Sequence, residues 1–104
     1  MPKFIFAYHG GKMPETEEAR ATEMAAWGEW MGSLGAALVD PGNPAGPSKT
    51  LSANGVADNG GANPISGYSL VNADNIDAAV EMAKGCPILK NGSIEVAEAI
   101  EMNM

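Results

Sequence analysis

The sequence predicts an α+β domain with a ferredoxin-like βαββαβ antiparallel sheet, which pairs with a second copy to form a dimeric α+β barrel. Three observations support this fold class. The 104 residues are enough for a single domain, residues 1–104, with its own core. Segments of strand and helix character follow one another as strand, helix, strand, hairpin, strand, helix and strand. One face of the resulting sheet keeps apolar side chains that two helices do not cover.

The first strand and the first helix are expected at residues 3–8 and at about residues 14–34. Residues 3–8 are apolar on both faces, which is typical of a strand covered on both sides. Pro14 and the carboxylates after it suit a first helical turn, and Gly35 suits the end of the helix. The helix residues expected to face the core are Met24, Trp27, Met31 and Leu34, with Trp30 to the side of this stripe.

The middle of the chain predicts a second strand and a small hairpin. Residues 36–40 have strand character, and the Pro- and Gly-rich residues 41–47 prevent the strand from continuing. Residues 49–52 and 56–57 flank Asn54-Gly55, a pair that favours a tight hairpin turn.

The remaining residues predict a strand, a helix and a final strand. Residues 65–72 form the third strand of the main sheet. Asp74 is expected to cap the second helix, which Gly85 ends in the left-handed conformation. The stripe that this helix should bury consists of Ile76, Ala79, Val80 and Ala83. Residues 93–101 form the last strand, with Ile94, Val96 and Ile100 on one face.

This order of elements places the first and last strands side by side, with both helices on one face of the sheet. The first, third and fourth strands each leave an alternate set of apolar side chains on the other face. A soluble monomer rarely exposes so large a patch. We therefore expect a homodimer that packs sheet against sheet.

Composition and charge exclude several classes of function. The net charge of −7, from 13 acidic and 6 basic residues, argues against nucleic acid and an anionic membrane as partners. A single Cys and a single His exclude a disulfide framework and an ordinary His/Cys metal cage, so we expect neither a metal nor a cofactor. No segment resembles a signal peptide or a membrane span, and the expected location is the cytoplasm.

Three polar residues lie at strand ends that the topology brings to one end of the barrel. His9 ends the first strand, Asp40 ends the second and Ser66 lies near the start of the third. A carboxylate beside a histidine orients the ring for acid–base catalysis, and Asp58 is an alternative to Asp40 in this role. The competing interpretation is a histidine in a strand-end loop, with Asp40 capping the turn before Pro41.

The expected ligand pocket is lined by Trp30, Ser66, Tyr68 and Asp58. Trp30 lies beside the core stripe and is therefore a candidate wall between helix and sheet. Tyr68 is either a core aromatic or a second wall, and its hydroxyl needs a partner if buried. Cys86, which follows the negative end of the second helix, is expected to be an inert thiol.

Five short motifs together resemble one known family: residues 8–11 (YHGG), 27–31 (WGEWM), 66–71 (SGYSLV), 83–87 (AKGCP) and 92–96 (GSIEV). The chain resembles the YCII-related family, and more closely the branch named for its Asp-Gly-Pro-Phe motif. The resemblance covers essentially the whole chain and implies the dimeric ferredoxin-like barrel. The name motif is degenerate, because Asp58 is followed by Asn59-Gly60-Gly61. Some members of the family carry a His at the start of the first helix, where residues 13–18 have none.

The residues and the resemblance leave several functions open. The first is a cofactor-free small-molecule enzyme that uses His9 and Asp40 for lyase-like acid–base chemistry, which a few relatives of the family perform. The second is a non-catalytic small-ligand-binding or regulatory module of the same fold. A third is a monooxygenase, since barrels of this architecture also carry out that chemistry.

Overall fold

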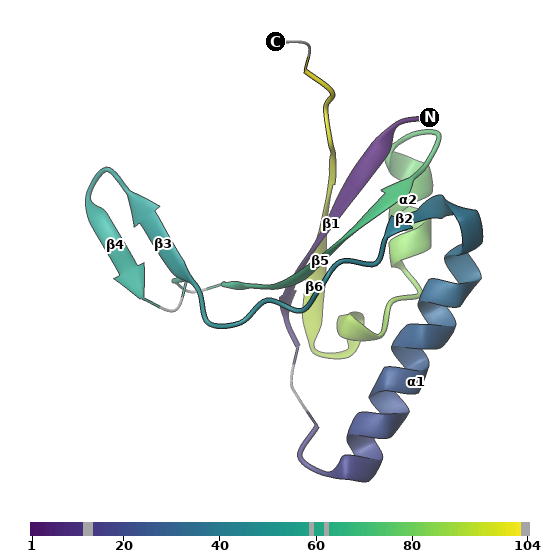
Figure 1. The fold of residues 1–104 in the computed structure, drawn as a ribbon, viewed down its shortest axis with the longest axis horizontal. Helices are drawn as coiled ribbons and strands as arrows, with labels where there is room; N and C mark the ends of the chain where they lie inside the picture. Colours follow the sequence, from purple (N-terminus) through teal and green to yellow (C-terminus); the bar gives the residue numbers. More distant parts are fainter. Residues whose placement is uncertain (12–13, 59, 62, 103–104) are drawn as a thin grey trace.

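The computed structural model describes residues 1–11, 14–58, 60–61 and 63–102. Within these ranges the chain is α+β, with two α-helices and a four-stranded antiparallel sheet (Figure 1). The sheet has the order β2-β5-β1-β6 and is compatible with a ferredoxin-like fold. The elements are β1 (Lys3–Gly10), α1 (Glu17–Leu34), β2 (Leu38–Asp40), β3 (Lys49–Ser52), β4 (Gly55–Asp58), β5 (Ile65–Asn72), α2 (Ile76–Ala83) and β6 (Gly92–Glu98). The predicted pairing of the first and last strands is confirmed, because β1 lies between β5 and β6.

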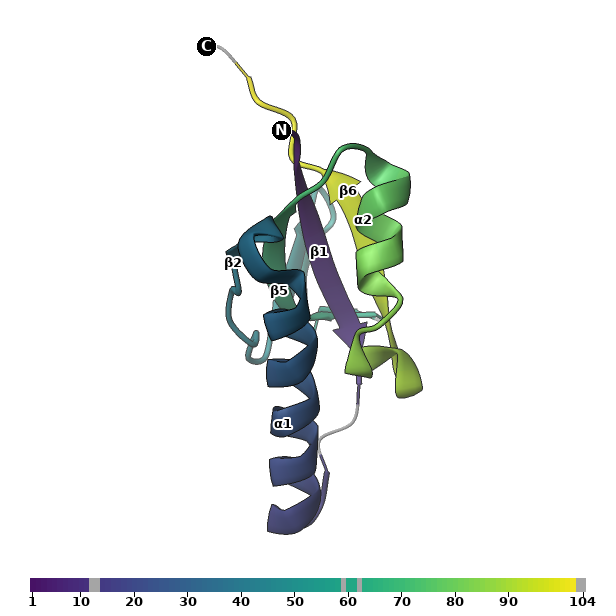
Figure 2. The same ribbon diagram turned by 90° about the vertical axis from the view of Figure 1, so that its right-hand side faces the viewer.

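The two helices cover one face of the sheet and leave the other face open (Figure 2). Phe4, Phe6 and Tyr8 of β1 alternate with exposed or half-buried residues and are themselves buried against the helices. Ser69 and Val71 of β5 join them on this side and are fully buried. Alternation along the strands therefore sets one buried face and one open face.

Helix α1 begins three residues later than predicted, at Glu17, because the Thr16 side chain caps it. Thr16 Oγ1 accepts a hydrogen bond from the Ala19 amide at 3.0 Å. The helix ends at Gly35, as expected, with a φ of 56°. The expected core stripe is wrong in part, since Met24 is 75% exposed. The N-terminal part of α1 runs past the end of the sheet (Figure 2), and Met24 lines a cavity instead of the core.

Both predicted ends of α2 are corrected by the structure. Asn75, not Asp74, caps the helix, because its Oδ1 accepts from the Ala78 amide at 2.8 Å. Gly85 does not adopt the left-handed conformation, since the chain continues from Ala83 through a Lys84 with ordinary helical angles. The buried stripe is narrower than predicted: Ala79 and Ala83 are buried, whereas Ile76 and Val80 are 48% and 37% exposed.

The two edge strands are shorter than predicted. A 3₁₀ turn occupies residues 35–37, so β2 begins at Leu38. Strand β6 ends at Glu98, and Ile100 beyond it is 75% exposed. Ile94 and Val96 of β6 pair with Tyr8 and Phe6 and therefore face the helices. The expected apolar set of β6 on the open face is consequently wrong, because that face receives the alternate residues Ser93, Glu95 and Ala97.

The predicted hairpin is confirmed as β3 and β4, but its turn lies one residue earlier than predicted. Ser52 pairs with Gly55, so Ala53 and Asn54 form the turn and Gly55 begins β4. Gly55 has a φ of 128°, which a side chain would disfavour. The hairpin projects from the side of the sheet opposite the helices (Figure 1). Among the helices in the described part of the chain, none has the length and apolar character needed to cross a membrane.

Burial of two ionisable core groups predicts a loss of stability at alkaline pH. Burial raises the pKa of the Cys86 thiol from 9.0 to about 11 and that of the Tyr8 phenol from 10.0 to about 12. Above pH 9 the unfolded chain releases protons that the folded chain keeps, so the free energy of unfolding should fall as pH rises towards 12. Urea denaturation at half-unit steps from pH 8 to 11 measures this fall.

The Cys86→Ala variant is the control for this measurement, because it removes the group with the lower ordinary pKa. Its free energy of unfolding should decline less than that of the wild type between pH 9 and 10. Equal slopes in the two proteins over that interval would contradict the proposed contribution of Cys86.

Candidate functional site

A cavity of about 520 Å³ lies between α1, the turn after β2 and the ends of β1 and β5. Its walls are mainly apolar and include Trp27, Met31, Pro41, Pro44, Tyr68 and Ile88. Arg20 and Glu23 of α1 bring the two charged side chains to its lining. A volume of this size is typical of a small-molecule site.

The two tryptophans have exchanged the roles that the sequence predicts, which are a core position for Trp27 and a pocket wall for Trp30. Trp30 is buried in the core, where it stacks on Phe6 and its indole N–H donates to the Met82 carbonyl at 2.9 Å. Trp27 is half-buried, lies edge-on to Tyr8 with ring centroids 5.1 Å apart, and lines the cavity. Trp30 borders only a separate, shallow depression formed with residues 85–90. The pocket wall expected of Trp30 is therefore provided by Trp27.

A chain of buried hydroxyl groups joins β1 and β5 to the turn that closes the cavity. The Tyr8 hydroxyl donates to Ser69 Oγ at 2.7 Å, and Ser69 Oγ donates to the Pro41 carbonyl at 2.7 Å. Because burial raises the pKa of Tyr8 to about 12, the phenol stays protonated at neutral pH. Tyr8 and Ser69 thus hold the turn in place and supply no charge to the cavity.

Ser66 lies at an irregularity in β5 next to this cavity. Tyr8 pairs with Gly67 and His9 with Ile65, so Ser66 is the extra residue of a bulge. Its carbonyl accepts from the Ala45 amide at 2.9 Å. Its hydroxyl is buried and, among the described residues, has no hydrogen-bond partner. A buried polar group in this state is rare and requires an explanation.

Gly42 allows the turn after β2 to close over β5. Its φ is 72°, and a Cβ at this position would lie 1.7 Å from the carbonyl oxygen of Tyr68. The turn therefore passes Tyr68 at a distance that only glycine permits. Tyr68 itself is 38% exposed and lines the cavity at this point.

His9 points to the face of the sheet opposite Tyr8, and its carboxylate neighbour is Glu95. His9 Nδ1 lies 3.2 Å from the Asn63 carbonyl, and Nε2 lies 3.3 Å from Glu95 Oε1. Both neighbours are acceptors, so each ring nitrogen faces an oxygen to which an N–H can donate. Glu95 was not predicted, because its place beside His9 follows from the pairing of β6 with β1, which residue spacing does not reveal.

The predicted meeting of His9 with Asp40 or Asp58 does not occur. On β5, His9 pairs with Ile65 and Asp40 with Leu70, which separates them by roughly 16 Å along the strand. Asp40 instead accepts a hydrogen bond from the Gly42 amide at 2.8 Å, as the competing interpretation expects.

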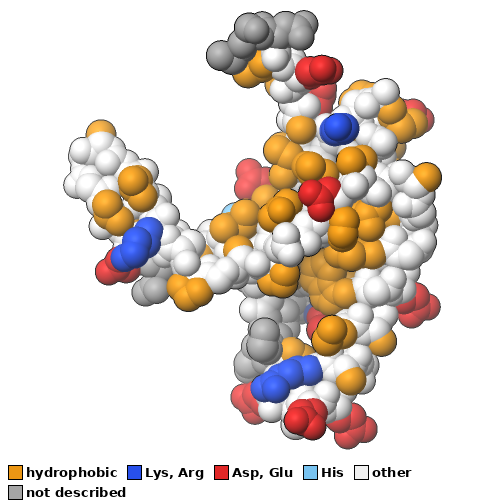
Figure 3. Space-filling view, in the orientation of Figure 1, with side chains coloured by type: hydrophobic (Ala, Val, Ile, Leu, Met, Phe, Trp, Pro, Cys, Tyr) orange, Lys and Arg blue, Asp and Glu red, His pale blue; other side chains and the backbone are white. Residues whose placement is uncertain are grey.

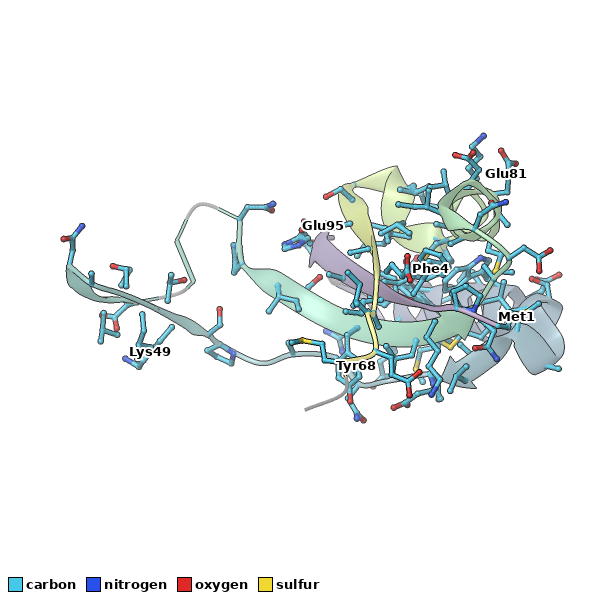
Figure 4. The ribbon with its side chains drawn as sticks, turned by 90° about the horizontal axis from the view of Figure 1, so that it is seen from above. Met1, Phe4, Lys49, Tyr68, Glu81 and Glu95 are labelled. Carbon is cyan, nitrogen blue, oxygen red and sulfur yellow. The ribbon has the colours of Figure 1, made fainter. Side chains whose placement is uncertain are left out.

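Asp58 pairs with Lys49 at 2.7 Å, on the hairpin and well away from Glu95 (Figure 4). The pocket role predicted for Asp58 therefore has no place in this cavity. In the described ranges, no three His, Cys, Asp or Glu side chains gather as ligands for a metal ion.

One comparison with known proteins identifies a family. The family model described as YCII-related domain matches residues 4–103. Searches of the curated proteins and of the solved structures gave no match.

Two serines of β5 provide a matched test of the buried hydroxyl groups. Ser66→Ala removes an unpartnered polar group and should raise the free energy of unfolding by about 1 kcal/mol. Ser69→Ala leaves the Tyr8 hydroxyl and the Pro41 carbonyl without their partner and should lower it by about 2–3 kcal/mol. Urea denaturation of both variants measures these shifts. Changes of the same sign would contradict this assignment.

Proposed function

This chain belongs to the YCII-related domain family, and we propose that it binds a small, mainly apolar molecule in the cavity beside Trp27. The observation that carries the proposal is a mainly apolar cavity beside the bulge at Ser66, whose buried hydroxyl has no hydrogen-bond partner among the described residues. A ligand oxygen that accepts from this hydroxyl would compensate for the cost of burying it. The bulge at this position uses the Ser66 carbonyl for a hydrogen bond from the Ala45 amide but leaves the Ser66 hydroxyl without a partner among the described residues, which favours a role for that hydroxyl in binding.

The lining of the cavity indicates the class of ligand. Trp27 and Met31 present aromatic and thioether surfaces, which suit a flat ring system. Arg20 provides a positive charge at the same cavity and suits a carbonyl or carboxylate group on the ring. We therefore propose a small aromatic compound that carries one such oxygen group.

The groups at the base of the cavity favour binding over catalysis. Tyr8 stays neutral at physiological pH, and the Ser69 hydroxyl is bonded to Tyr8 and to Pro41. A hydroxyl nucleophile is activated by a base within hydrogen-bond reach, and the histidine that could serve as this base, His9, lies on the other face of the sheet. The geometry therefore supports the ligand-binding module more than the enzyme.

A second candidate function is supported by the contact between His9 and Glu95. A histidine ring oriented by a carboxylate at 3.3 Å has the arrangement used for proton transfer. The Glu95 side chain is 73% exposed, so this pair lies at the surface of the open face. In this candidate Glu95 takes the orienting role that the sequence suggested for Asp40.

The open sheet face supports a homodimer of the dimeric α+β barrel type. Ile5 and Tyr68 on this face are 36% and 38% exposed, and Ile65 is 40% exposed. A second copy packed sheet against sheet would cover these side chains on both chains at once. The proposed partners are thus a second copy and a small molecule.

Ligand binding is tested with a panel of benzoates, naphthoates and indole carboxylates. At least one compound should raise the Tm of the wild type, and isothermal titration should give its affinity. Trp27→Ala should weaken that affinity at least about tenfold, because it removes the main aromatic wall. Leu89→Ala, a change in the separate shallow depression, is the matched control and should leave the affinity unchanged. If no compound binds, or if both variants bind equally well, the proposal is wrong.

The two candidate functions are separated by His9→Ala. Because His9 faces away from the cavity, this variant should bind the same compound within about twofold of the wild type. If the protein also converts that compound, acid–base chemistry at His9 predicts that turnover falls by about a hundredfold or more. Turnover that persists unchanged in the variant would reject the catalytic candidate.

A further inference from the structure

The hairpin of β3 and β4 extends from the domain with its whole surface exposed. We call residues 49–58 the arm. Leu51 and Val56 pair directly across it and are 74% and 61% exposed. The arm stands on the side of the sheet opposite the helices, next to the open face (Figure 1). A two-stranded hairpin with no supporting surface is at best marginally stable in water.

The chain exposes more surface than a compact monomer of its size. The accessible surface is 7191 Å², whereas a compact protein of 10.7 kDa exposes about 5,500 Å². The radius of gyration is 15.0 Å, against roughly 13 Å for a compact domain of this length. A standard protein interface buries about 800 Å² on each partner. The excess surface is therefore large enough for a stable interface on every chain.

We infer that the arm packs against a second copy of this chain, an inference that rests on the sheet-to-sheet dimer of the proposed function. Facing sheets pack about 10 Å apart, and a four-residue strand spans about 13 Å. An arm that rises from the open face is therefore long enough to pass a second sheet and lie along its flank. A two-fold axis makes this contact reciprocal, so each dimer buries two arms.

The chemistry of the arm suits an acidic partner such as this chain. Leu51 and Val56 point to the same face of the hairpin, because they are direct cross-strand partners. Lys49 and Asp58 form an ion pair at 2.7 Å, so the arm as a whole carries no net charge. Hydrophobic side chains and a charged pair are visible on the surface of the arm in Figure 3. A neutral, apolar arm avoids the repulsion that a charged one would meet from a copy carrying −7.

Both connections of the arm are attached to the sheet, so its direction is set by the domain. On the entering side, Pro44 forms a bridge with Gly67, and the Ala45 amide donates to the Ser66 carbonyl at 2.9 Å. On the returning side, the Asn63 carbonyl lies 3.2 Å from Nδ1 of His9. The arm therefore leaves the domain from a preorganised base, which lowers the entropic cost of docking.

The experiment compares the dimer affinity of an arm variant with that of the wild type. Sedimentation velocity from 0.1 to 100 μM should show a dimer for the wild type. The double variant L51S/V56S should weaken dimerisation by about a hundredfold or more, because it removes the apolar contact of both arms. The variant T50S/A57S, which changes the other face of the arm to a similar extent, is the control and should dimerise like the wild type.

Two further measurements check that both variants are folded and that the arm is covered in the dimer. Circular dichroism should show the same folded spectrum for both variants, since the changed residues are exposed and outside the core. Hydrogen exchange of the arm amides in the wild type should slow as the concentration rises through the dimer range. The L51S/V56S variant is also titrated with the compound that binds the wild-type cavity beside Trp27. This measurement tests ligand binding separately from dimerisation.

Three outcomes would overturn the inference. The first is a wild type that stays monomeric at 100 μM. The second is an L51S/V56S variant that dimerises as tightly as the wild type, which would leave a sheet-to-sheet dimer without the arm. The third is fast exchange of the arm amides in a fully dimeric sample. A wild type that dimerises through its arms but binds none of the compounds would instead reject the proposed function.

Discussion

The arrangement of this protein depends on the packing of Trp30 between the two helices and the sheet. Its ring stacks on Phe6 of β1, and its N–H donates to the last turn of α2 at Met82. Gly85 passes so close to the ring that a Cβ would lie 3.1 Å from it. One side chain thus connects α1, α2 and β1, and it determines which side of α1 faces the sheet. The rest of the core consists mostly of small or strand residues that fit around this contact.

The cavity is a consequence of this packing. With Trp30 turned into the core, Trp27 is rotated to the edge of the sheet, where it meets Tyr8 edge-on. Helix α1 continues past the sheet from there, and the turn after β2 closes the opposite side. Tyr8 and Ser69 hold that turn with two short hydrogen bonds. The result is an apolar space with fixed neutral groups at its base, which is an arrangement suited to holding a molecule.

The two faces of the sheet carry different chemistry. The helix side contains the cavity, whereas the open side carries His9, Glu95 and the base of the arm. The apolar surface of the open side and the exposed arm belong to the same chain, and both lack cover within the described monomer. One kind of contact, with a second copy, would cover both of them. The acidic charge of the chain is compatible with this contact because the arm is neutral.

The sequence by itself determined the element order, the strand Ile65–Asn72, the presence of a hairpin within residues 49–58 and the end of α1 at Gly35. Each of these depends on signals between residues close in the chain, such as alternation, turn chemistry and caps. Only the tertiary structure decided that Trp30 rather than Trp27 enters the core and that His9 meets Glu95 rather than Asp40. Helix rotation and strand register depend on contacts between distant segments, and a shift of one residue exchanges the faces. Local patterns are compatible with several such arrangements, and the packing of the whole domain selects one of them.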